Sequence, residues 1–68
     1  MKIIRWERHG DLHVGVDDRG WKRAVIMSED FQHYGYAPLG AVVPVREFRE
    51  RNLRRLRHRI VNMLEELP

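Results

Sequence analysis

The last third of the chain has the hydrophobic spacing of an amphipathic helix. Its apolar residues recur three and four positions apart, which places them on one side of a helical wheel; they are Leu53, Leu56, Ile60, Met63, Leu64 and Leu67. Pro44 suits the first position of such a helix, where a backbone N–H is not needed. The pattern predicts one long helix over residues 44–67.

The first 28 residues have shorter apolar runs, which are typical of strands. β-Branched and aromatic residues gather in three segments, namely 2–8, 12–16 and 21–28. Glycine and aspartate separate these segments at the positions where tight turns favour them. Two short connections between three runs predict an antiparallel β-meander.

The second of these runs alternates between large and small side chains. Leu12, Val14 and Val16 share one face, so we expect them to face the core, with His13 and Gly15 pointing outward. A glycine inside a strand often marks the close approach of a ring or of another backbone. We therefore expect an aromatic neighbour over Gly15.

Residues 29–43 are the least regular stretch. Two glycines and one proline fall within 35–40, and the stretch carries the aromatic residues Phe31, Tyr34 and Tyr36. We interpret it as an irregular aromatic loop, with 41–43 as a short strand or an extended lead-in to the helix. The predicted fold is α+β, in a single small domain over residues 1–68. It comprises a three-stranded antiparallel β-meander, this loop, and one long C-terminal amphipathic helix packed on the sheet.

The expected helix is longer than the sheet that it covers. A 22-residue helix runs about 33 Å, whereas strands of about seven residues run roughly 23 Å. The overhang then stands in solvent or contacts a partner, and a homodimer is one way to cover it.

The composition narrows the classes of protein. The chain has 68 residues and no cysteine, so neither disulfides nor thiolate zinc ligands are available to stabilise it. The longest apolar run, 24–27, is too short to cross a bilayer, and the first ten residues lack the apolar segment of a signal peptide. A basic amphipathic helix can also lie on anionic lipid, but this helix needs its apolar side to cover the sheet. We expect a cytoplasmic protein without membrane contact.

The net charge of +3 is confined to the C-terminal part. Residues 1–44 carry six Lys/Arg and six Asp/Glu, whereas residues 45–68 carry seven arginines and four glutamates. Arginine favours bidentate contact with phosphate or carboxylate. A genomic bias toward arginine is the alternative explanation.

The basic side of the helix suggests a binding function. We expect Arg51, Arg54, Arg55 and His58 to contact the phosphate backbone of DNA or RNA. The arginines and lysine of the predicted sheet would extend this patch, namely Arg5, Arg8, Lys22 and Arg23. The alternative is a small inhibitor or adaptor, of the phage or mobile-element type, that binds an acidic surface of a host protein or ribonucleoprotein complex. Phe31, Tyr34 and Tyr36 would then anchor the interface.

Catalysis and metal binding find little support in the sequence. Ser28 is the one serine, threonine and cysteine are absent, and no phosphate-binding glycine loop occurs. His9, Asp11, His13 and His33 match no zinc-ligand spacing. We therefore expect no enzyme, no metal and no cofactor.

Overall fold

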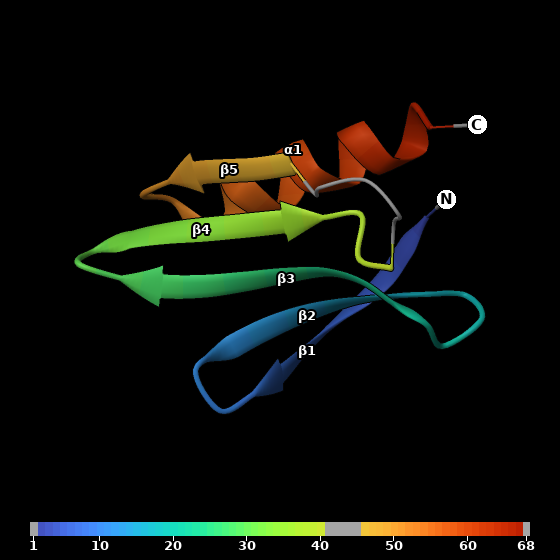
Figure 1. The fold of residues 1–68 in the computed structure, drawn as a ribbon, viewed down its shortest axis with the longest axis horizontal. Helices are drawn as coiled ribbons and strands as arrows, with labels where there is room; N and C mark the ends of the chain where they lie inside the picture. Colours follow the sequence, from blue (N-terminus) through green and yellow to red (C-terminus); the bar gives the residue numbers. More distant parts are fainter. Residues whose placement is uncertain (1, 41–45, 68) are drawn as a thin grey trace.

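The computed structural model describes residues 2–40 and 46–67. Its strands are β1 (Ile3–His9), β2 (Leu12–Asp17), β3 (Lys22–Glu29), β4 (Gln32–Ala37) and β5 (Arg46–Glu50), and the helix α1 spans Leu53–Glu65. The strands form one antiparallel sheet in the order β1-β2-β3-β4-β5, and α1 lies against one face of it (Figure 1). An α+β fold with a single C-terminal helix is therefore observed in the described residues.

The prediction of a three-stranded sheet is wrong, because the sheet has five strands. β1, β2 and β3 lie close to their expected positions. β4 lies inside the predicted aromatic loop and continues the meander by pairing with β3, for example Met27 with Tyr34. β5 in turn pairs with β4, with Gly35 opposite Phe48. The predicted strand or lead-in at 41–43 lies outside the described residues.

The helix is shorter than predicted, because β5 occupies part of the segment that was expected to be helical. α1 has 13 residues, so it is about 20 Å long at 1.5 Å per residue. β3, with eight residues, is roughly 26 Å long. The helix is therefore shorter than the longest strand, and helix length is no longer a reason to expect a homodimer.

The core lies between α1 and the sheet face that it covers. α1 contributes Leu56, Ile60, Met63 and Leu64, all buried. The sheet contributes Ile26 together with small residues, Ala24, Gly35 and Ala37. Small residues in the middle of the sheet allow the large helix side chains to approach the strands closely. α1 packs mainly across β4 and β5. β1 and β2 therefore lie to one side of the helix.

The face assigned to β2 was also wrong. Gly15 pairs with Ala24 and His13 pairs with Ile26, so both lie on the face that α1 covers. Leu12, Val14 and Val16 lie on the opposite face, which we call the far face. The expected aromatic neighbour of Gly15 is present, because a Cβ there would lie 3.1 Å from two ring atoms of Trp6. The ring fills the space that a side chain at Gly15 would need.

Candidate functional site

The N-terminus of α1 is rich in arginine. Asn52 is the N-cap, and its Oδ1 accepts a hydrogen bond from the backbone N–H of Arg55 at 3.1 Å. The first turn contains Arg54 and Arg55 and no acidic residue. Positive charge at this end of a helix opposes the macrodipole, at a cost of about 0.3–1 kcal/mol per exposed charge. The arrangement is unfavourable for the isolated helix and becomes favourable when an anion binds there.

One flank of α1 faces the helix-side surface of β1 and β2. Arg54 and Arg57 share this flank because they are three residues apart. His58 is exposed and lies on the side of α1 opposite the buried residues. The contacts of Arg57 show that this flank faces β1 and β2. Its Nη2 lies 3.1 Å from Nδ1 of His13 in β2, and its guanidinium lies 5.3 Å from the ring centroid of Trp6 in β1. Since a guanidinium can only donate, Nδ1 of His13 accepts and the imidazole proton is on Nε2. This contact joins residues 44 apart in the sequence.

The charged groups that act on His13 are cationic or can become so. Burial lowers the pKa of His13 below its ordinary value of 6.5, and the positive charges of Arg57, Arg8 and His33 lower it further. Arg8 pairs with His13 in the sheet register and is exposed. Nε of Arg57 is buried and has no hydrogen-bond partner within the described residues. We call Arg8, His13, Arg54 and Arg57 the basic flank.

The four residues of the predicted helix that were expected to bind a partner are exposed, although Arg51 lies in the corner before α1 and not in the helix. Arg51, Arg54, Arg55 and His58 form no ion pair with any acidic side chain of residues 2–40 and 46–67. Arg59 differs from them, because its Nη1 lies 2.8 Å from Glu50 and its guanidinium lies over the ring of Phe48. The structure thus distinguishes Arg59, which holds α1 to β5, from the arginines whose charge is available to bind a partner.

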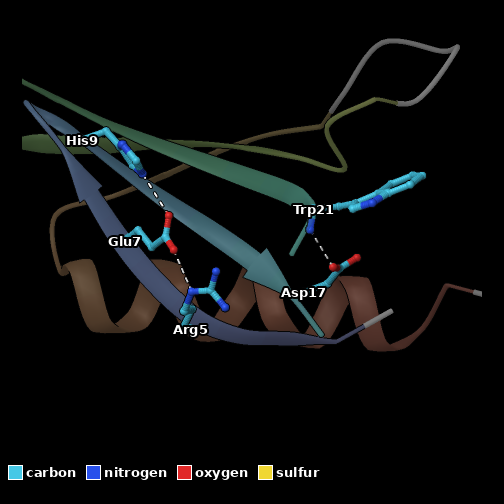
Figure 2. Close-up of polar contacts among 5 residues, drawn as sticks. All are labelled: Arg5, Glu7, His9, Asp17 and Trp21. Atoms are coloured by element: carbon cyan, nitrogen blue, oxygen red, sulfur yellow. Dashed lines mark hydrogen bonds and ion pairs between the residues drawn. The ribbon is translucent and has the colours of Figure 1, made fainter. Parts of the chain in front are cut away.

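Arg5 does not extend the basic flank. It lies on the far face, and its Nε is 2.7 Å from a carboxylate oxygen of Glu7. The other oxygen of Glu7 contacts Nε2 of His9 at 3.0 Å, so the three side chains form a row along β1 (Figure 2). Hydrogen bonds from Arg5 and His9 lower the pKa of Glu7. The charge of Arg5 is therefore balanced locally.

Arg23 is the second residue of β3, next to the β2–β3 turn. Its Nε donates to Asp17 at 2.9 Å, and its guanidinium lies 4.8 Å from the Trp21 ring centroid. The other oxygen of Asp17 accepts from the backbone N–H groups of Arg19 and Trp21, both at 2.9 Å. Figure 2 shows the bond from Trp21. The Arg23 bond and these N–H groups lower the pKa of Asp17, which is only 4% exposed. Lys22 is exposed at this same end of the sheet, far along β3 from the basic flank.

Of the three aromatic residues expected at an interface, two share one face of β4 and the third lies at the β3–β4 turn. Tyr34 and Tyr36 are partly buried on the far face, where they pair with Met27 and Val25. Phe31 lies between β3 and β4 and is 99% exposed. Its φ of 63° follows a φ of 49° at Asp30, so the connection has both central residues in the left-handed region.

Sequence reasoning missed Arg57 and His13 as parts of one site. The spacing of Arg54 and Arg57 was a usable signal, because residues three apart lie on one side of a helix. No local signal placed His13 opposite them, since its face depended on the sheet register. Both residues were visible in the sequence, but their contact was not.

No protein-family model, no curated protein and no solved structure gives a significant match to this chain. Within the described part of the chain, no three His, Asp or Glu side chains come together in a way that could hold a metal ion. No helix in residues 2–40 and 46–67 is long and apolar enough to cross a membrane.

Proposed function

We propose that this chain is a cytoplasmic, non-enzymatic module that binds nucleic acid through the basic flank. The observation that carries the proposal is the convergence of cations on His13. Nη2 of Arg57 lies 3.1 Å from His13, and Arg8 pairs with His13 in the sheet register. No described acidic side chain forms an ion pair with Arg57 or Arg8. A phosphate beside these groups would relieve their mutual repulsion.

The residues of the basic flank suit a phosphodiester backbone. Arg54 and Arg8 offer planar forks of donors that can bind two phosphate oxygens at once. Arg57 is held in place by Trp6 and His13, so less side-chain freedom is lost when it binds. Arg51 and Arg55 add charge at the positive end of α1. Binding would release counterions and would weaken as salt increases.

The test is a pair of charge-matched double variants. Arg8→Glu with Arg54→Glu reverses two charges of the basic flank, and Arg19→Glu with Lys22→Glu reverses two exposed charges at the β2–β3 end. Affinity for fluorescently labelled DNA and RNA would be measured by anisotropy at several salt concentrations. Each phosphate contact contributes about 0.7–0.9 to the log–log salt slope.

We expect the flank variant to lose affinity strongly, with a slope shallower by about 1.5 if each arginine contacts one phosphate. The control variant has the same net charge and should stay close to the parent protein. Equal losses in both variants would mean that net charge alone drives binding. If the parent protein binds no nucleic acid even at low salt, the proposal is wrong. An acidic protein surface then becomes the better candidate for the same arginines.

A further inference from the structure

Phe31 occupies a position that the fold alone does not explain. A two-residue hairpin connection with two positive φ angles favours Asn-Gly or Asp-Gly. Here the connection is Asp30-Phe31, with φ angles of 49° and 63°. A bulky residue in the left-handed region is rare, and the ring is 99% exposed, so it gains no burial. Backbone strain of this kind concentrates at functional positions.

The hairpin tip lies at the end of the sheet where α1 begins. The last pair between β4 and β5 joins His33 to Glu50. Phe31 lies two residues before His33 and Arg51 one residue after Glu50, so both project beyond this pair. Figure 1 shows the β3–β4 turn and the corner from β5 to α1 at the same end of the molecule.

Aromatic and arginine residues are interleaved at this end. On the far face Tyr34 pairs directly with Arg49, which is exposed. Beyond them lie Phe31 and Arg51, and the first turn of α1 follows. Interleaved rings and guanidinium groups are the elements with which proteins bind single-stranded nucleic acid. Bases stack on the rings and phosphates contact the cations.

The acidic residues of this end restrict what can contact the tip. Glu29 and Asp30 come directly before Phe31 and would repel a phosphate, but they do not repel an uncharged base. Glu50 is neutralised by Arg59 at 2.8 Å. The ring of Phe31 is therefore suited to a base, while the phosphates are directed to the arginines.

We propose that Phe31 stacks on an unpaired base and that Arg49 and Arg51 bind the neighbouring phosphates. The preferred ligand is then single-stranded DNA or RNA. This proposal rests on the proposed function and deepens it, because the basic flank by itself does not distinguish single strands from duplexes. A duplex keeps its bases stacked inside the helix, where the hairpin tip does not reach their faces without unstacking them.

The experiment compares two substitutions at one position. Phe31→Gly removes the ring and leaves Asp-Gly, which suits this turn, so the variant should fold at least as well as the parent. Phe31→Trp keeps an aromatic surface. Each protein would be titrated by anisotropy with three labelled probes of equal length: oligo(dT), an abasic single strand, and a duplex. Thermal unfolding would confirm that both variants are folded.

Phe31→Gly should weaken oligo(dT) binding about tenfold, within the range measured for loss of one stacked base. Binding of the abasic strand and the duplex should not change, and Phe31→Trp should retain the parent affinity. Unchanged oligo(dT) affinity in Phe31→Gly overturns the stacking proposal, and so does an equal loss on the duplex or the abasic strand. In those cases the proposed function stands as long as the parent protein shows salt-dependent binding. A parent protein that binds none of the three probes overturns both.

Discussion

Replacing Gly35 by alanine should test how closely α1 approaches the sheet. A Cβ at this position would lie 2.5 Å from Cδ1 of Ile60 and 3.2 Å from Cδ1 of Leu56. Carbon atoms in contact prefer separations of about 3.5–4.0 Å. The added methyl therefore overlaps Ile60 by about 1 Å. Both helix residues are fully buried, so neither can move into solvent to make room.

The expected cost follows from two opposing effects. Overpacking a well-packed core costs about 1–3 kcal/mol, while alanine gains roughly 0.5–1 kcal/mol over glycine inside a strand. The net loss in the free energy of unfolding for Gly35→Ala should lie between zero and about 2.5 kcal/mol, with about 1.2 kcal/mol as the central value. For a domain of this size each kcal/mol lowers the Tm by about 4–8 °C. A fall of about 5–10 °C should be visible in thermal unfolding followed by circular dichroism.

A second substitution identifies the cause of that loss. Ile60→Val removes the Cδ1 atom that the new methyl would meet, and by itself it should cost about 0.5–1.5 kcal/mol. In the Gly35→Ala background the same change relieves the overlap, so its cost should fall or reverse. The rescue should be partial because the Leu56 contact remains. Urea unfolding of the two single variants and the double variant gives the coupling energy. If the two effects add within about 0.3 kcal/mol, the close approach of Ile60 does not explain the loss.

Two further predictions concern pH. The pKa of His13 is lowered in the folded protein, so the unfolded chain binds a proton more readily. The free energy of unfolding should therefore show no loss due to His13 above about pH 6.5 and should fall as the pH drops below that value. In urea unfolding, His13→Gln should make the free energy of unfolding less dependent on pH in this range. The pKa of Asp17 is lowered from 3.8 by the hydrogen bond from Arg23 and by two backbone N–H groups. The stability that it contributes should be present above about pH 3.8 and lost as the pH falls through its folded-state pKa. Asp17→Asn should be less stable at neutral pH and should lose less on acidification; an acid profile parallel to that of the parent would contradict this.

The strands that the sequence missed show the limits of local patterns. β4 carries glycine between two tyrosines, which resembles a loop, yet α1 approaches Gly35 so closely that a Cβ there would lie 2.5 Å from Ile60. β5 has the sequence Arg-Glu-Phe-Arg-Glu, whose arginine and glutamate residues favour a helix. Pairing with β4 overrides that preference, and it directs Phe48 into the core beside Gly35. Strand formation here depends on neighbours more than on the segment itself.

The sequence by itself determined the features whose causes are local. The apolar spacing in the last third identified the buried side of α1, including Leu56 and Ile60, and left Arg54 and Arg55 exposed. The turn residues between the first three runs identified β1, β2 and β3, because turn conformation depends on a few adjacent residues.

Only the tertiary structure decided which face of β2 meets the helix and which arginines remain free. The alternating side chains of β2 allowed either face of the strand to point toward α1. In the structure, His13 and Gly15 lie on the face that α1 covers, where Gly15 pairs with the small residue Ala24. That choice brings His13 to Arg57 across 44 residues and assembles the basic flank. The periodicity of a strand defines two faces, but the packing of another element is needed to choose between them.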